Sequence, residues 1–150
     1  MNKRQKSIIN EFILVCVIIA AVVVGLLNFK DYVNRTEGMR AMQQLGGEVL
    51  NYRKEHGSVP PEYYVEQIKG QLEGSARLGG MAYRARWIEY GASGDEILAY
   101  ARRDYGMIIG TGYIVLRLDG RVEWMGVKEF KKLFDLQQSP EEKRFGEQKL

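Results

Sequence analysis

The hydrophobic pattern of the chain begins with an unbroken apolar run near the N-terminus. Residues 12–27 are sixteen consecutive uncharged residues that follow a short basic segment. With Ile8, Ile9 and Asn28 the run reaches about 20 residues, enough for a helix to cross a bilayer about 30 Å thick. The pattern therefore predicts a membrane-spanning helix at residues 8–28.

Beyond this run, apolar residues recur at intervals of three and four, which is the spacing of one helical stripe. Because no proline interrupts it, we expect one continuous helix from about Ile8 to His56, about 70 Å long, with its first half in lipid and its second half amphipathic. Gly38 and the Gly46-Gly47 pair weaken the second half by about 1 kcal/mol each, and the pair permits either close packing or a bend. The stripe comprises Phe29, Tyr32, Val33, Met39, Met42, Leu45, Val49 and Tyr52.

Gly57 and the Pro60-Pro61 pair mark the end of the long helix. Glycine adopts the left-handed conformation of a helix C-terminus easily, and proline cannot continue a helix. A short second helix is expected at residues 62–72, and the glycines after it indicate an irregular connection.

From Tyr83 onward the pattern is typical of short strands. Residues 86–90 and 96–100 are predicted strands joined by a glycine-containing turn. Residues 113–124 predict a hairpin, and the parity of its loop decides which side chains share a face.

A two-residue loop in this hairpin would mix apolar and charged residues on both faces. A three-residue loop at residues 118–120 instead pairs Leu116 with Val122 and Ile114 with Trp124 on one face. It also places Gly120 where a type I turn with a bulge needs positive φ. We favour this register, which sets Arg117 opposite Arg121 with a mild, solvent-screened repulsion.

The last part of the pattern predicts a short helix at residues 127–136, followed by a polar, loosely held tail. The expected fold class is α+β, with a long N-terminal helix packed on a small antiparallel sheet and a short C-terminal helix. The expected organisation is a cytoplasmic basic stub at 1–7, a transmembrane helix at 8–28, an extracytoplasmic α+β domain at 29–136 and a flexible tail at 137–150.

Charge predicts the orientation of the chain. Lys3, Arg4 and Lys6 precede the apolar run and should stay cytoplasmic, so the rest of the chain lies outside. The flank after the run has no small-x-small site for signal peptidase, and Val15 is not the small residue that lipidation of Cys16 requires. Nineteen basic and eighteen acidic residues remain beyond the anchor, so the outer part is near neutral.

Candidate catalytic and metal-binding residues are few. His56 is the only histidine and lies near a helix C-terminus, where its partial charge is favourable. Ser58 has no recognisable third partner for a triad. Asp95, Glu96 and Asp104 match no calcium-loop spacing. We therefore expect no enzyme activity, no cofactor and no metal.

A basic aromatic patch for nucleic acid would combine stacking with phosphate contacts. We do not expect one, because alternating strand faces would separate Arg86 from Trp87 and interspersed acidic residues dilute the charge. The candidate residues are Arg77, Arg84, Arg86, Arg102, Arg103, Tyr83, Trp87 and Tyr105.

Three segments resemble type IV pilins and type II secretion pseudopilins. Residues 3–12 resemble the basic leader and the G-F-T-L-I-E processing site of the family, and residues 52–60 resemble its Y-x-x-x-x-G-x-x-P segment. Residues 114–124 are similar to the V-L-F-x-D-G-x-V-x-W hairpin of pseudopilin-like proteins. The resemblance implies a structural subunit of a secretion or pilus-type system in the bacterial inner membrane.

The processing site differs from the family pattern. Lys6 stands where the family has the glycine before the cut, and Ser7 stands where it has an N-methylated phenylalanine. Glu11 is then fifth from the cut, where the family has an acidic residue that neutralises a neighbouring subunit's amine. If the leader is retained, Glu11 either sets the register between packed membrane helices or lies in the headgroup zone beside Lys6 and Arg4.

Two functional hypotheses follow. The chain is either an assembling pilin-like subunit or a monomeric, membrane-tethered binding or accessory domain that does not polymerise. Its partners are the lipid bilayer and, under the first hypothesis, other pilin-like subunits. Lateral packing requires small or apolar residues that allow helices to approach closely. The candidates are Ala20, Ala21, Gly25, Phe29, Tyr32 and Val33.

Overall fold

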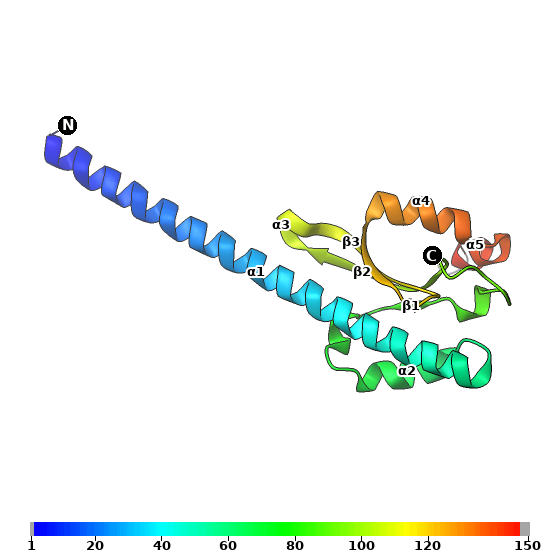
Figure 1. Cartoon of the computed structure of the whole chain (residues 1–150). Helices are drawn as coiled ribbons and strands as arrows, with labels where there is room; N and C mark the ends of the chain where they lie inside the picture. Colours follow the sequence, from blue (N-terminus) through cyan, green and yellow to red (C-terminus); the bar gives the residue numbers. More distant parts are fainter. Residues whose placement is uncertain (1, 148–150) are drawn as a thin grey trace.

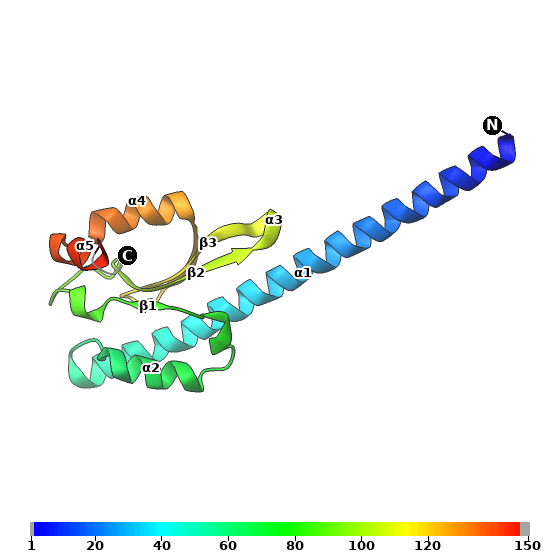
Figure 2. The same ribbon diagram turned by 180° about the vertical axis from the view of Figure 1, so that it is seen from behind.

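The protein consists of one long helix and a small domain built against its C-terminal half (Figures 1 and 2). The computed structural model describes residues 2–147. A four-stranded antiparallel sheet of order β1-β2-β3-β4 has α1 and α2 on one face and α4 on the other, so the predicted α+β fold is confirmed. The elements are α1 (Lys3–His56), α2 (Glu62–Gln71), η1 (Ser75–Arg77), β1 (Ala82–Tyr83), η2 (Ala85–Trp87), β2 (Ile97–Tyr105), α3 (Gly106–Ile109), β3 (Gly110–Arg117), β4 (Val122–Gly126), α4 (Val127–Gln137) and α5 (Pro140–Glu147).

The long helix is continuous over 54 residues, as its pattern predicted. It begins before Ile8, because the Gln5 side chain accepts a hydrogen bond from the Asn2 amide (3.1 Å) and caps the first turn. It ends at Gly57, which has φ 75° and donates its amide to the Arg53 carbonyl (2.8 Å). The left-handed residue expected at the helix end is therefore confirmed.

Two glycines of α1 let the helix lie close against β3. A Cβ atom at Gly38 would lie 2.7 Å from Ile114 Cδ1, and one at Gly46 would lie 2.8 Å from Leu116 Cδ1. Either distance is shorter than carbon atoms tolerate, so a larger residue would force the buried Ile114 or Leu116 side chain to shift. Of the Gly46-Gly47 pair, Gly46 thus serves close packing, and α1 continues through both residues. Its fully buried neighbours on this side are Ala41, Met42, Leu45 and Val49.

The β3–β4 hairpin has the register that the sequence favoured. Leu116 pairs with Val122 and Ile114 with Trp124, and Gly120 has φ 89° in the three-residue loop. The expected repulsion across the loop is offset by other charges. Arg117 forms an ion pair with Glu123, and Arg121 Nε donates to Asp119 Oδ2 (2.6 Å).

The predicted strand at residues 86–90 is wrong. The chain forms the 3₁₀ turn η2 there, and the short strand that pairs with β2 is β1, at Ala82–Tyr83. The reason lies in Arg84, whose guanidinium is buried and whose Nη1 donates to the Ile97 carbonyl (2.5 Å). Turning this side chain inward ends the strand. The other predicted strand is longer than expected and runs over Ile97–Tyr105, because β3 pairs with it along its length, with one register shift between Ile97 and Ala99.

The expected flexible tail is also wrong where it is described. Residues 140–147 form α5, whose Glu142 is 7% exposed, and residues 148–150 lie outside the described part. Arg84 Nε and Nη2 donate to the two Glu142 carboxylate oxygens at 2.7 and 2.8 Å. Arg84 Nη2 also donates to the Gln137 carbonyl (3.2 Å), so the pair fastens the C-terminal segment to the sheet. Arg84 and Glu142 are 58 positions apart, so no local pattern in the polar C-terminal segment predicts that it is ordered.

The predicted C-terminal helix is confirmed as α4, which ends one residue later at Gln137. Phe130 packs with Ile97, Val115 and Met125 in a second apolar cluster on the sheet face opposite α1. Leu133 and Phe134 pack around this cluster from the same helix. Both faces of the sheet are therefore covered.

We expect Gly46→Ala and Gly47→Ala to have opposite effects on stability. Open space surrounds Gly47, so alanine there should stabilise the helix by about 0.5–1 kcal/mol. Alanine at Gly46 gains the same helical preference but must displace Leu116, and overpacking costs about 1–3 kcal/mol. Thermal unfolding of the full chain in detergent, followed by near-ultraviolet circular dichroism, measures the difference. Equal melting temperatures for the two variants would contradict the close approach.

We expect Glu142→Gln to destabilise the domain by about 3–5 kcal/mol, because it leaves the buried Arg84 charge without its partner. Glu141→Gln, at the exposed neighbouring position, is the matched control and should change little. The same melting experiment measures both, and limited proteolysis reports release of α5. A Glu142→Gln protein that resists protease as well as the control would argue against the ion pair as the fastening.

Candidate membrane and assembly surface

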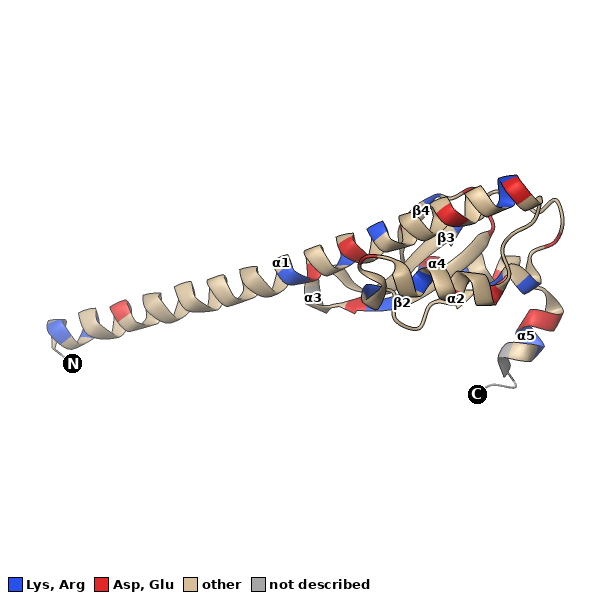
Figure 3. Ribbon diagram, turned by 90° about the horizontal axis from the view of Figure 1, so that it is seen from below, with Lys and Arg blue, Asp and Glu red and all other residues tan. Residues whose placement is uncertain are grey.

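The N-terminal half of α1 is a bare apolar rod. This helix is long and apolar enough to span a membrane, and none of its most apolar 18-residue window is buried against the rest of the protein. Figure 3 shows no charged residue between Glu11 and the start of the domain. Fully burying one large aliphatic side chain is worth about 1.5–3 kcal/mol, and this many exposed apolar side chains together favour an apolar environment. The predicted single membrane span therefore fits the structure.

The start of the rod holds Lys6, Ser7 and Glu11, the residues compared with the pilin processing site in the sequence. Ser7 Oγ donates to Glu11 Oε1 (3.2 Å) across one turn of the helix. Among the described residues no ion pair joins Lys6 to Glu11, since residues five apart project from different sides of a helix. The structure thus brings Ser7 and Glu11 together and leaves Lys6 apart.

Four of the candidate packing residues share one side of α1, which we call the outer face: Ala21, Gly25, Phe29 and Tyr32. Phe29 precedes Gly38 by nine residues, about two and a half turns, so it projects from the side opposite the sheet. No atom lies within 4 Å of a Cβ placed at Gly25. The outer face is therefore not covered by the chain's own domain.

The other two packing candidates lie elsewhere. Ala20 precedes Gly38 by eighteen residues, about five turns, and so lies on the domain side of the helix. Val33 is half-buried. Glu11 precedes Phe29 by the same five turns, which places it in line with the outer face.

The helix passes from the apolar rod into the polar domain without a break. Asn28 Nδ2 donates to the Val24 carbonyl (2.8 Å), which satisfies the amide within the helix. Charged residues begin with Lys30 and Asp31. Close to them lies Tyr105, whose pKa is raised by burial, although the positive charges of Arg103, Arg35 and Arg77 oppose the rise.

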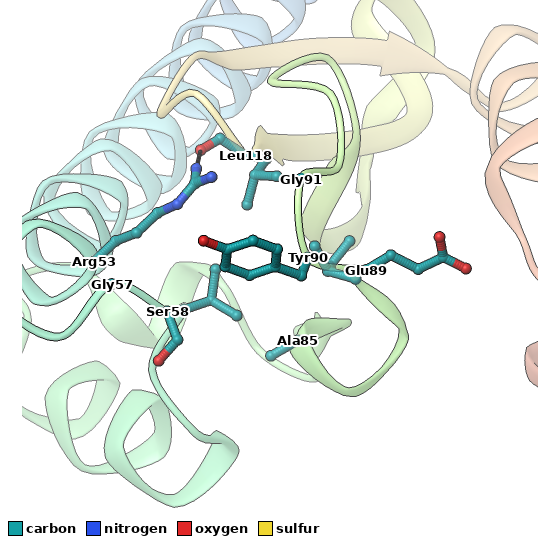
Figure 4. A pocket seen from close by; sticks show the side chains of 10 residues that line it. Arg53, Gly57, Ser58, Ala85, Glu89, Tyr90, Gly91 and Leu118 are labelled. Carbon is teal, nitrogen blue, oxygen red and sulfur yellow. Dashed lines mark hydrogen bonds between the residues drawn. The ribbon is translucent and has the colours of Figure 1, made fainter.

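The pocket at the far end of α1 is an open hollow of about 500 Å³ (Figure 4). It lies between the end of α1 and the loop before β2, with Ser58 on one side and the fully exposed Tyr90 on the other. Arg53 Nη1 donates to the Leu118 carbonyl (3.4 Å) beside it. His56 stacks on the Tyr52 ring, with 4.0 Å between the centroids, which is a structural contact.

The basic and aromatic candidates do not form one patch: Arg77, Arg103 and Tyr105 line one hollow, and Arg86 and Trp87 lie together elsewhere. Arg84 is buried against Glu142, and Arg77 Nε donates to Glu37 (2.9 Å). Arg86 lies over the Trp87 ring, 5.1 Å from its centroid, because residues 85–87 form a turn. The expected separation of these two residues is therefore wrong.

The acidic loop residues do not gather either. Asp95 pairs with Arg121, and within residues 2–147 no group of three metal-ligating side chains is found.

Sequence reasoning missed the tip of the β2–β3 hairpin. The signal was an uncharged run over residues 105–113, in a position where hairpin turns usually carry polar residues. At this tip Ile108 is 72% exposed.

Comparison with protein-family models, with curated protein sequences and with solved structures found no match.

Proposed function

We propose that this chain is a non-enzymatic, pilin-like structural subunit of a bacterial secretion or pilus-type assembly. Its helix is anchored in the inner membrane with the basic stub in the cytoplasm, and the domain lies on the periplasmic side. The observation that carries the proposal is the outer face of α1, which is apolar, contains small residues and is turned away from the chain's own domain.

The chemistry of the outer face suits contact between helices in lipid. There is no hydrophobic driving force between helices within a bilayer, so association depends on close packing and on polar contacts. Ala21 and Gly25 are spaced four apart, the spacing that lets two helix backbones approach. Glu11 lies in line with them and supplies a polar group that gains from a partner.

We expect a cysteine at Tyr32 to form disulfide-linked dimers in membranes. Tyr32 is 55% exposed on the outer face just beyond the apolar rod, so neighbouring copies would bring these positions together. Lys30→Cys is the matched control, because it is also exposed but projects about 160° away around the helix. Both variants carry Cys16→Ala, and dimers are measured by non-reducing electrophoresis after mild oxidation.

Adding Gly25→Leu should weaken the crosslink at Tyr32→Cys, whereas Ala20→Leu should not. Equal crosslinking at positions 32 and 30, or no effect of Gly25→Leu, would count against assembly through the outer face.

The second candidate is a monomeric, membrane-tethered binding or accessory domain. Lys6 in place of the glycine before the cut favours it, because a retained leader provides a permanent anchor and no new amine for Glu11 to neutralise.

The mass of the mature N-terminus separates the two functions. Loss of six residues with methylation of Ser7 is expected for an assembling subunit, and an intact leader is expected for the tethered domain. Mass spectrometry of the chain purified from its membrane makes the measurement, with a Lys6→Gly variant as the control for a restored processing site.

A further inference from the structure

The tip of the β2–β3 hairpin has an unusual composition for an exposed turn. Nine residues in a row, 105–113, carry no charge, and α3 turns the chain at their centre. Gly106 and Gly110 bound this turn with φ 64° and 76°, conformations that glycine adopts without strain. The turn thereby presents Ile108, which is 72% exposed.

A single exposed isoleucine is normal on a protein surface, so the position of Ile108 relative to α1 is what matters. A Cβ atom at Gly106 would lie 2.6 Å from Asp31 Oδ2, which sets the tip beside the start of the polar part of α1. Figures 1 and 2 both show the tip next to α1 and directed toward the N-terminal half of the helix.

The depth of the tip follows from helix geometry. Asp31 is three residues beyond Asn28, the end of the apolar span, which is about 4.5 Å along the helix axis. The headgroup layer on each side of a bilayer is about 5–8 Å thick. With α1 spanning the membrane, Gly106 lies at the level of this layer. Ile108 lies at the turn, on the side of Gly106 that is directed toward the membrane.

Aromatic side chains lie at the same level on the other side of the helix. Phe29 is 67% exposed and precedes Asp31 by two residues, so it projects about 160° away from the hairpin tip. Tyr32 is 55% exposed beside it. Tyrosine is enriched where a membrane meets water, so Tyr32 is typical of an interfacial position at this height.

We propose that the hairpin tip Gly106–Ile109 is a second membrane contact, in which Ile108 inserts into the headgroup layer of the bilayer that α1 spans. This inference depends on the membrane anchoring in the proposed function and adds a lipid-binding surface within the domain. The contact holds the domain against the membrane and fixes its orientation around α1. Because the tip carries no charge, the contact requires no anionic lipid.

The test uses the full chain with Cys16→Ala and Ile108→Cys, labelled with an environment-sensitive fluorophore and reconstituted into phosphatidylcholine vesicles. Lipids that carry a nitroxide near the headgroup should quench most of the fluorescence at position 108. The same label at Tyr90→Cys, which is fully exposed at the far end of the domain, should keep its fluorescence. Adding anionic lipid or salt should change neither result.

Three outcomes would overturn the proposal. In the first, iodide in the water quenches the label at position 108, the nitroxide lipid does not, and the chain resists an alkaline wash. The membrane anchoring then stands, but the tip does not bind lipid. If the label is shielded only at high protein density and becomes exposed on dilution with empty vesicles, the tip contacts a second copy. If the alkaline wash releases the chain, the anchoring itself is wrong and the inference fails with it.

Discussion

The close contact between α1 and β3 is the constraint on which the rest of the structure depends. Gly38 and Gly46 bring the helix so near the sheet that Ile114 and Leu116 occupy the space a Cβ atom would need. This contact fixes which side of the helix the domain covers. By helix geometry it also fixes which side of the N-terminal half lies in line with the domain and which side is turned away from it, because one continuous helix joins both halves. The outer face is thus a consequence of core packing in a different part of the chain.

A buried ion pair completes the domain on the other face of the sheet. Arg84 and Glu142 are both almost fully buried, and the guanidinium also bonds two backbone carbonyls. A charge out of water is tolerable only when its partner and its remaining hydrogen-bond positions are satisfied, and this site meets that condition. The pair holds α5 and the end of α4 over the sheet edge, where Gln137 accepts the Ile97 amide (2.8 Å).

The exposed surfaces that we connect with function all lie on or beside the membrane-directed part of α1. The outer face offers small and apolar residues to another helix, and the hairpin tip offers an uncharged turn to the lipid surface. The outer face and the hairpin tip lie on opposite sides of α1, so helix–helix contact and membrane contact do not compete for space. The hollow at the far end of α1 lies away from both.

Local signals determined much of this protein from the sequence alone. An unbroken apolar stripe without proline predicts the long helix, Gly57 predicts its end, and parity predicts the β3–β4 register, because each depends only on neighbouring residues. Only the tertiary structure decided the turn at residues 85–87 and the ordered α5, since both depend on Arg84 meeting a carboxylate 58 positions away. The same holds for the hairpin tip. Its lack of charge is written in the sequence, but its height beside Asp31 is set by how β2 and β3 pack along α1.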